Sequence, residues 1–269
     1  MYRSLHCEPM SAHHASRVAP TAALRGRTVV ITRPAGTGSS MARQVRALGG
    51  RPLLLPGLSL RGMDDAATRS SLAEALRDDV LVFSSPAAVR FAARLQLLRT
   101  GAKVLAVGQG TARALRRQGI RAVAAPSKRQ DSEGLLDLPI WAGLGPCRIA
   151  LIGAPGGRGV LRDQLATRGS LREVQVYHRA PPRLRASHWE GLRALERDAC
   201  VLLSSAEAVE NLRELAPTAV WQQLTSCVAI VSSERLSLAA KSVGFRRIHL
   251  ATSANATDLL AAAADVQEV

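Results

Sequence analysis

The stretch RIALIGAPGGRGVLRDQLATRGSLREVQVYHRAPP, from Arg148 to Pro182, decides the fold. Its apolar run, Ile149 to Ile152, has the length of a buried strand. A glycine-rich loop from Gly153 to Gly159 follows, and its glycines can adopt positive φ and let the backbone approach a ligand closely. The apolar spacing after the loop predicts a helix that stops at Gly169.

A second strand is predicted from Val174 to Tyr177, and the two prolines Pro181 and Pro182 should end the regular structure after it. The order of strand, glycine loop, helix and strand is typical of an α/β unit. A glycine loop that leads into a helix N-terminus favours an anion as ligand. The same glycines are also explained by a tight turn alone, and their spacing does not choose between the two.

The chain contains this pattern twice. The pair Ser84-Ser85 follows one apolar strand and Ser204-Ser205 follows another, 120 residues later (204 minus 84). The expected helix-stopping glycines Gly49 and Gly169 have the same offset, and three further elements recur in the same order. Five matching elements predict two similar α/β lobes, each with a mostly parallel sheet flanked by helices.

The composition sets limits on the partners. The chain has 269 residues, 47% of them hydrophobic, which suffices for two lobes with cores of their own. Its formal net charge of +15 favours a polyanionic partner, and a solvated basic surface is the alternative.

The cysteines indicate neither a zinc site nor a disulfide framework, because Cys7, Cys147, Cys200 and Cys227 are scattered. They suit a reducing, cytoplasmic setting. No apolar run approaches the ~20 residues of a membrane helix, so no membrane partner is expected. Residues 1–26 have no apolar periodicity and are expected to form a disordered tail without a secretion signal.

In parallel sheets, ligands bind beyond the carboxyl ends of the strands. The loops expected there are rich in glycine, serine and threonine, and they supply backbone N–H groups and hydroxyls. The chain shows no carboxylate dyad and no nucleophile beside a histidine. Each single serine is also explained as a helix N-cap. Taken together, the loops favour an oxygen-rich anion.

Eight motifs resemble the uroporphyrinogen-III synthase family, the bilane cyclases of haem biosynthesis, over about residues 27 to 262. They are VVITRP (Val29–Pro34), VFSSPAAVRF (Val82–Phe91), AVGQGTARAL (Ala106–Leu115), DSEGLL (Asp131–Leu136), GAPGGRGVLRDQL (Gly153–Leu165), VQVYHR (Val174–Arg179), VLLSSAEAV (Val201–Val209) and VAIVSSERL (Val228–Leu236).

The resemblance implies an interleaved arrangement of the lobes. Residues 27–54 and 179–269 would form domain 1 and residues 55–178 domain 2. A two-stranded antiparallel link would join them, with the active-site cleft between the lobes. Such a link would act as a hinge.

The resemblance also implies a reaction without cofactor or metal. Hydroxymethylbilane would lose its hydroxyl as water and close, with inversion of ring D, to uroporphyrinogen III. Its eight carboxylates give the +15 charge a reason, and catalysis would rest mainly on positioning. We expect a monomer whose partner is this small molecule and not a nucleic acid.

Site residues are carried over from the matching motifs. Tyr177 is the candidate general acid, since a phenol is protonated at neutral pH; a packing role at the hinge is the alternative. Some members of the family have threonines where this chain has residues 232–236, so only Ser233 is taken from that loop. The substrate-binding candidates are Arg33, Ser84, Ser85, Thr111, Gly156, Gly157, Arg158, Ser204, Ser205 and Ser233.

Two other functions compete with this one. A two-lobed module that binds an anionic ligand without catalysis would share the fold. A nucleic-acid binder would share the charge, but the chain has few aromatic residues for base stacking and lacks a dense basic helix; Arg113, Arg116 and Arg117 come nearest to one. Analysis of the porphyrin isomers formed from hydroxymethylbilane separates all three.

Overall fold

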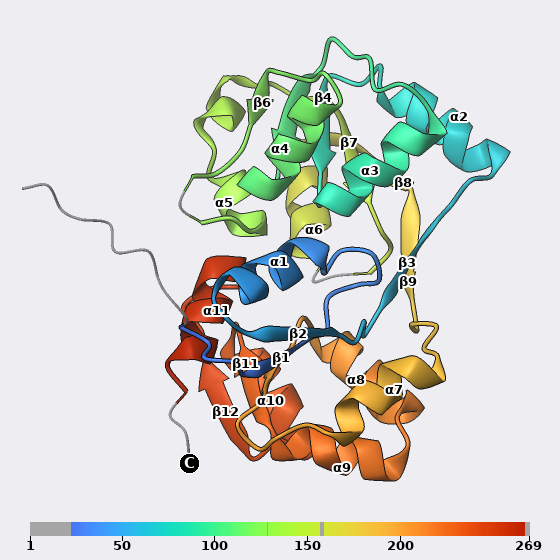
Figure 1. Ribbon diagram of the computed structural model, residues 1–269. Helices are drawn as coiled ribbons and strands as arrows, with labels where there is room; N and C mark the ends of the chain where they lie inside the picture. The colour runs from blue at the N-terminus through green and yellow to red at the C-terminus, as the bar shows by residue number, and fades with distance from the viewer. Residues whose placement is uncertain (1–22, 128, 157–158, 267–269) are drawn as a thin grey trace, which may run out of the picture. The chain divides into compact units, whose positions relative to one another are not determined.

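The computed structural model describes residues 23–127, 129–156 and 159–266 (Figure 1). It contains two five-stranded parallel sheets and one antiparallel pair of strands. The described chain divides into two compact units after Leu55 and after Leu184. The predicted fold class, two α/β lobes with parallel sheets joined by a small antiparallel sheet, is confirmed.

Unit 2 is the continuous middle of the chain, and its parallel sheet has the order β6-β5-β4-β7-β8. Its elements are β3 (Ser59–Gly62), α2 (Ala66–Ala75), β4 (Val80–Phe83), α3 (Pro86–Leu95), β5 (Lys103–Ala106), α4 (Gln109–Arg117), β6 (Val123–Ala124), α5 (Ser132–Leu136), a 3-10 turn (Pro139–Gly143), β7 (Cys147–Gly153), α6 (Val160–Ala166), β8 (Gly169–Gln175) and β9 (Tyr177–Ala180).

Unit 1 combines the start and the end of the described chain. Its sheet has the order β12-β11-β10-β1-β2, so the first strand pairs in parallel with a strand from the C-terminal part. The elements are β1 (Thr28–Ile31), α1 (Ser39–Ala47), β2 (Arg51–Leu54), α7 (Ala186–Arg193), β10 (Cys200–Leu202), α8 (Ala206–Leu215), α9 (Thr218–Ser226), β11 (Val228–Val231), α10 (Glu234–Ser242), β12 (Arg247–Leu250) and α11 (Ala256–Ala264).

Continuous apolar strands are buried on both faces in each unit. In unit 2, Leu81 and Phe83 face a cluster with α2, α3 and α4, whereas Val80 and Val82 face a cluster with α5 and α6. This alternation follows from the two-residue period of a strand. Helices on both faces exclude water from the sheet, which explains why its central strands have no polar side.

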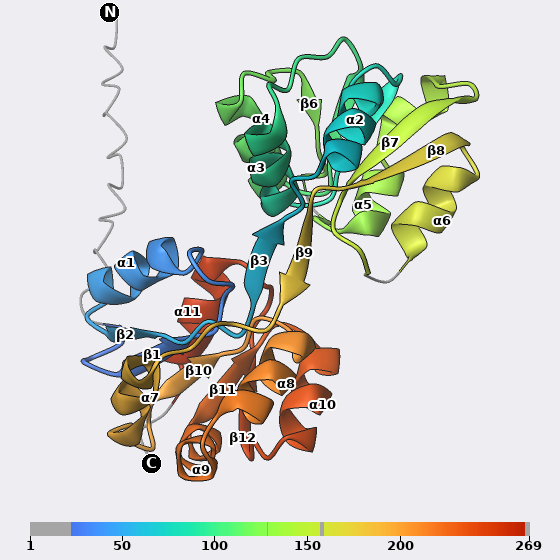
Figure 2. The same ribbon diagram turned by 90° about the vertical axis from the view of Figure 1, so that its right-hand side faces the viewer.

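Strands β3 and β9 form the antiparallel pair, with Ser59 opposite Ala180 and Gly62 opposite Tyr177 (Figure 2). Both strands belong to unit 2, so the second unit boundary lies after Leu184 and not after residue 178 as expected. Pairing with β3 holds β9 in this unit.

Three expectations need correction. Leu24 is 1% exposed, and its N–H donates to Leu48 O at 2.9 Å, so the tail does not extend to residue 26. Gly169 begins β8 instead of ending a helix, and a Cβ there would lie 2.0 Å from Cys147 O. Helix α9 was missed because it has no counterpart in the first repeat, and α7 was missed although α2, 120 residues earlier (186 minus 66), corresponds to it.

Candidate active site

The carboxyl end of the unit 2 sheet holds a pocket of about 660 Å³. The loops after β4 and β7 line it, together with the start of β9. It brings together four of the predicted site residues from three segments far apart in the sequence: Ser84, Ser85, Gly156 and Tyr177. All four belong to unit 2.

Tyr177 lines this pocket although only 5% of its surface is exposed. Its hydroxyl lies 3.1 Å from Ser85 Oγ, and either oxygen can be the donor. Its ring stacks on Phe91, with the ring centroids 5.3 Å apart and the planes at 18°. The side chain is therefore held at both ends, and its hydroxyl stays beside the pocket.

Ser85 caps α3, because its Oγ accepts a hydrogen bond from the N–H of Ala88 at 3.0 Å. Pro86 follows at the first helical position, where a missing N–H costs nothing. The N-cap interpretation of this serine is thus confirmed. The same hydroxyl also meets Tyr177, which the motif alone did not indicate.

Ser84 stands at the end of β4, where its Oγ donates to Ile152 O at 3.2 Å. A Cβ on Gly153 would lie 2.4 Å from that Oγ, so a side chain there would displace the Ser84 hydroxyl from its present position. Gly156 has a φ of 80° and Gly159 a φ of 71°, the positive values expected for this loop. Gly157 and Arg158, two further site candidates, lie outside the described residues.

Thr111 lies apart from this pocket, in the first turn of α4 and 3% exposed. At the start of that helix the N–H of Gln109 donates to Oε1 of Gln130 at 3.1 Å. Thr111 is not among the residues that line the pocket, so the structure does not bring it together with Tyr177 there, and its binding role stays a prediction.

The remaining candidates belong to unit 1. Ser204 forms a pair with Thr32: the Ser204 N–H donates to Thr32 Oγ1, and Ser204 Oγ donates to Thr32 O, both at 3.0 Å. Ser205 caps α8 and Ser233 caps α10 through Oγ contacts with backbone N–H groups at 3.1 and 3.3 Å. Each of these serines has a structural partner, and substrate binding by them stays a prediction.

Arg33 follows β1 and donates to Ala254 O at 3.3 Å. Partial burial lowers the pKa of its guanidinium, and a bound carboxylate would offset that loss of hydration. Its role as an anion ligand stays a prediction, as does the cleft between the lobes.

Sequence reasoning missed several residues that line the unit 2 pocket. Arg179 is two residues beyond Tyr177 and therefore on the same face of β9, a signal that strand alternation offered. Arg162 lines it as well but is paired with Asp163 at 2.9 Å, and Glu173 adds a second carboxylate. Charges of both signs line the pocket, so net positive charge alone would not hold an anion there. Binding of an anionic ligand would also depend on the neutral hydrogen-bond donors of the pocket and on their positions.

The two repeats differ at the tyrosine. The corresponding stretch of the first repeat, residues 55–58, reads Leu-Pro-Gly-Leu. The tyrosine at the pocket is thus a feature of the second repeat and not of the duplication itself.

Other reactive groups of the described chain do not form a site. Burial raises the pKa of the Cys200 and Cys227 thiols to about 11, which disfavours their thiolates at neutral pH. Among residues 23–127, 129–156 and 159–266, no three His, Cys, Asp or Glu side chains group as a metal site would require. Nor does this part of the chain contain a helix of the length and apolarity that a membrane crossing needs.

Comparisons with known proteins agree with the geometry. A family model described as "Uroporphyrinogen-III synthase HemD" matches residues 39–261. The uroporphyrinogen-III synthase of Escherichia coli strain K12 is 30% identical over 256 residues, covering 87% of this chain and 99% of that protein. That of Salmonella typhimurium is 29% identical over 251 residues with the same coverage.

Two solved structures share the fold. Uroporphyrinogen-III synthetase from Helicobacter pylori has a TM-score of 0.58 at 14% identity and covers 87% of this chain and 96% of its own. A mutant uroporphyrinogen III synthase from the extremely thermophilic bacterium Thermus thermophilus has a TM-score of 0.53 at 20% identity with the same coverage.

Proposed function

Because this chain belongs to the uroporphyrinogen-III synthase family and is a cyclising lyase of haem biosynthesis, we propose that Tyr177 is the proton donor of its reaction and that positioning supplies the rest. The enzyme converts hydroxymethylbilane to uroporphyrinogen III with inversion of ring D and release of water. The non-catalytic binding module considered from the sequence is not favoured.

In the proposed step, the carbon–oxygen bond of the hydroxymethyl group breaks while the phenolic proton of Tyr177 adds to the leaving oxygen. That oxygen departs as water. Ring D then attacks the carbon left behind through its substituted α-position and gives a spiro intermediate. The methylene bond between rings C and D breaks and re-forms at the other α-position of ring D, which inverts this ring, and the proton that the pyrrole system finally loses restores the phenol or passes to solvent. The balance is one substrate to one product and one water, with no external oxidant or reductant.

The observation that carries this role is the contact between Tyr177 and Ser85. Ser85 Oγ already accepts the N–H of Ala88, so its own proton is available to the tyrosine oxygen. If Ser85 donates to Tyr177, the phenolic proton is left to point into the pocket. A neighbour that donates to the phenol also stabilises the phenolate that forms as the proton leaves.

The carboxylate side arms of the substrate need donors on more than one part of the protein. We assign Ser84 and the glycine loop around Gly156 to them in unit 2, and Arg33, Ser204, Ser205 and Ser233 in unit 1. Half-buried Arg33 is the strongest of these, because a guanidinium pairs with a carboxylate through two hydrogen bonds. We further propose that Thr111, Gly157 and Arg158 contribute donors to the same substrate.

We also propose that the enzyme acts in the cytoplasm as a monomer that needs neither metal nor nucleic acid. The free thiols of Cys147, Cys200 and Cys227 fit a reducing compartment. Light scattering after gel filtration, repeated with added substrate, measures the oligomeric state.

The test is conversion of hydroxymethylbilane, followed by oxidation and separation of the porphyrin isomers. We expect isomer III, with the same rate in the presence of a chelator. Tyr177→Phe keeps the ring and removes the hydroxyl, so turnover should fall by roughly 10²–10⁴-fold, the usual contribution of general acid catalysis. KM should move little and the product should remain isomer III.

Two outcomes contradict the proposal. Formation of isomer I alone would refute the synthase activity. A Tyr177→Phe enzyme with turnover within a few-fold of the parent and a lower melting temperature would make Tyr177 a packing residue, leaving positioning as the whole mechanism.

A further inference from the structure

Helix α3 contacts Tyr177 at two separate points. Its N-cap, Ser85, meets the phenolic oxygen at 3.1 Å, and Phe91 on the same helix stacks on the ring. We propose that Phe91 is a positioning residue for the reaction: by stacking on Tyr177 it keeps the hydroxyl within reach of Ser85 and of the substrate. This inference rests on the proposed proton-donor role of Tyr177.

The stacking is close and enclosed. Phe91 is 6% exposed and Tyr177 5%, and both belong to one core cluster with β4, β7 and β8. An offset parallel stack at a centroid distance of 5.3 Å is a favourable geometry for two aromatic rings. The Tyr177 side chain has only two rotatable bonds. The Phe91 ring against one face of it therefore restricts the rotation that would move the hydroxyl away from Ser85.

The antiparallel strands leave room for the Phe91 ring at one position. Gly62 of β3 lies directly opposite Tyr177 of β9. A Cβ on Gly62 would lie 3.1 Å from Cδ1 and 3.3 Å from Cε1 of Phe91, which is tighter than ordinary contact. The φ of Gly62 is not in the left-handed region, so glycine is needed here for space and not for backbone conformation.

Two arginines cover the Phe91 ring from the solvent side. The guanidinium carbons of Arg90 and Arg94 lie 5.4 and 5.3 Å from its centroid, within the range of a cation–π contact. Both side chains are exposed and stand on α3 itself. Helix α3 thus supplies the serine that contacts the phenol, the phenylalanine that stacks on it and the arginines that contact that phenylalanine. The position of the Tyr177 hydroxyl therefore depends on this one helix.

The principal experiment is steady-state kinetics of Phe91→Leu, alone and combined with Tyr177→Phe. Leucine keeps apolar bulk but removes the flat wall, so the hydroxyl gains freedom. We expect turnover to fall about ten-fold with KM nearly unchanged, because a misplacement of 1 Å can cost up to ~10²-fold. In the Tyr177→Phe background the same change should lower turnover by less than about two-fold, since no hydroxyl remains to be positioned.

Phe245→Leu is the matched control. Phe245 is 2% exposed and packs edge-on against Trp221 in unit 1, so the same substitution tests general destabilisation without touching Tyr177. We expect its melting temperature to fall as in Phe91→Leu and its turnover at 25 °C to stay within two-fold of the parent.

Gly62→Ala is a second variant that keeps every side chain of the group. The added methyl should displace the Phe91 ring by a few tenths of an ångström and lower turnover about two- to five-fold, again only while Tyr177 is present. It keeps the test available if Phe91→Leu is poorly folded.

The outcomes separate the two proposals. If Tyr177→Phe is slow but Phe91→Leu and Gly62→Ala keep parental turnover, the positioning role of Phe91 is wrong and the proton-donor role stands. If Phe91→Leu slows the double variant as much as it slows the parent, Phe91 acts independently of Tyr177 and the inference is again wrong. If Tyr177→Phe itself has parental turnover, the proposed function fails first.

Discussion

At the residue scale, one serine hydroxyl carries two duties. Ser85 closes the N-terminus of α3 and also contacts the phenol of Tyr177, whereas its counterpart Ser205 caps α8 in the other repeat. Both serines of the duplicated motif therefore cap a helix. Ser85 also contacts Tyr177, which gives this copy a proposed part in the reaction.

Alanine substitutions in the two copies separate these roles. Ser85→Ala and Ser205→Ala each remove an N-cap and should each cost about 1 kcal/mol of stability, measured by urea unfolding. Ser85→Ala should in addition lower turnover about ten-fold or more, because the phenol loses the hydroxyl that contacts it at the N-terminus of α3. Ser205→Ala should raise KM and leave turnover within about two-fold.

An equal fall of turnover in both variants would contradict this division of labour between the repeats. It would mean that the serines act alike on the substrate, and that the contact with Tyr177 has no part in the chemical step.

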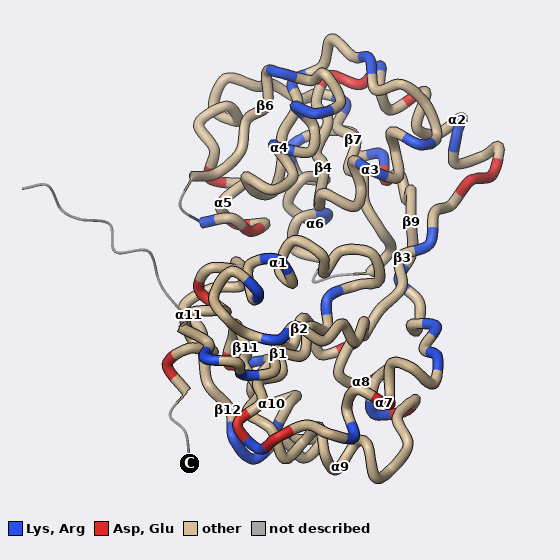
Figure 3. The backbone as a smooth tube through the Cα atoms, in the orientation of Figure 1, with Lys and Arg blue, Asp and Glu red and all other residues tan. Residues whose placement is uncertain are grey.

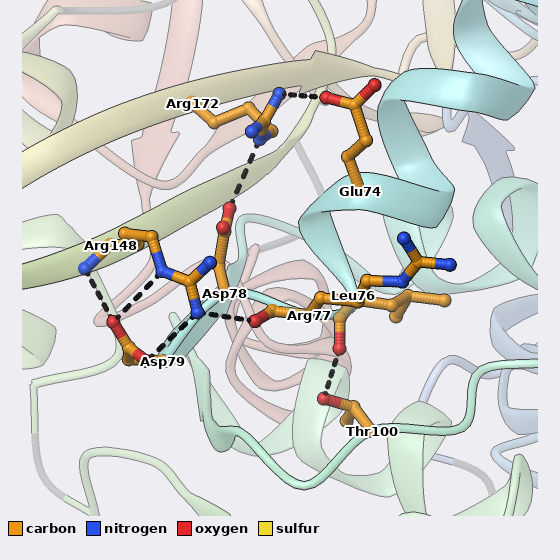
Figure 4. A network of polar contacts seen from close by, with 8 residues as sticks. All are labelled: Glu74, Leu76, Arg77, Asp78, Asp79, Thr100, Arg148 and Arg172. Carbon is orange, nitrogen blue, oxygen red and sulfur yellow. Dashed lines mark hydrogen bonds and ion pairs between the residues drawn. The ribbon is translucent and has the colours of Figure 1, made fainter.

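At the scale of elements, an ion-pair network joins the amino ends of the unit 2 strands (Figure 4). Asp78 accepts from Nε of Arg172 at 3.2 Å, and Arg172 also pairs with Glu74 of α2 at 2.7 Å. Next to it, Asp79 is bonded to the N–H and the guanidinium of Arg148 on β7. These contacts connect α2, β4, β7 and β8 at the opposite end of the sheet from the candidate active site.

The neighbouring residues Asp78 and Asp79 give a matched pair of variants. The Asp78 side chain is 3% exposed, so Asp78→Asn leaves Arg172 without its buried partner and should cost about 1–3 kcal/mol of unfolding free energy. Asp79 is half exposed, and Asp79→Asn should cost less. Turnover of both should match the parent, because the network is remote from the pocket.

The pH dependence of stability follows for Asp79. Its hydrogen bonds from Arg148 lower the pKa of the carboxyl below its ordinary value. A lowered pKa stabilises the fold above the unfolded-state pKa near 4, and this contribution disappears as the pH falls through the folded-state value. The difference in melting temperature between Asp79→Asn and the parent should therefore shrink as the pH falls below about 4. An unchanged difference at low pH would mean that the ion pair does not stabilise the fold.

The sequence predicted the elements that are strongly apolar or repeated. β4 and β10 were found because their runs are continuous and each precedes a serine pair. Most of β8 was missed, since the predicted strand began only at Val174 and the sequence GSLREVQ is mostly polar and reads as a loop after a helix. Pairing with β7 along seven residues holds it as a strand, and such long-range pairing is invisible in local pattern.

The candidate site was predicted in part for the same reason. Ser84, Ser85, Gly156 and Tyr177 were named from motifs, and the structure brings them together at one pocket. The bond between Ser85 and Tyr177, however, joins residues 92 positions apart. Phe91 was named only as the last residue of a matching motif, and nothing in its spacing indicated that a tyrosine would stack on it.

At the scale of the whole molecule, charge is the property that most concerns the substrate. Lysine and arginine outnumber aspartate and glutamate by 36 to 21, and they are distributed over both units (Figure 3). The pocket around Tyr177 contains charges of both signs, so we expect the excess positive charge to act mainly as a long-range field that attracts a polyanion. The contacts within the pocket are short-range and should depend less on salt.

This division predicts how salt affects the kinetics. Charges at the surface are screened over ~8 Å at physiological ionic strength, so raising sodium chloride from about 50 to about 500 mM should increase KM roughly several-fold. Turnover should change by less than about two-fold, because proton donation and ring closure occur between groups already in contact. The fraction of isomer III should not change.

Sodium fluoride at equal ionic strength is the control for specific binding of chloride, and a thermal melt in each salt shows that the fold is intact. If chloride competes with a substrate carboxylate for its binding site, KM should rise more in chloride than in fluoride. The salt effect would then come from competition at individual ligands such as Arg33 and not from screening of the long-range field. A KM that stays constant in both salts would show that long-range electrostatic attraction does not contribute to substrate binding. In that case hydroxyls and backbone N–H groups would account for binding, and the +15 charge would be a property of the surface without a role in the reaction.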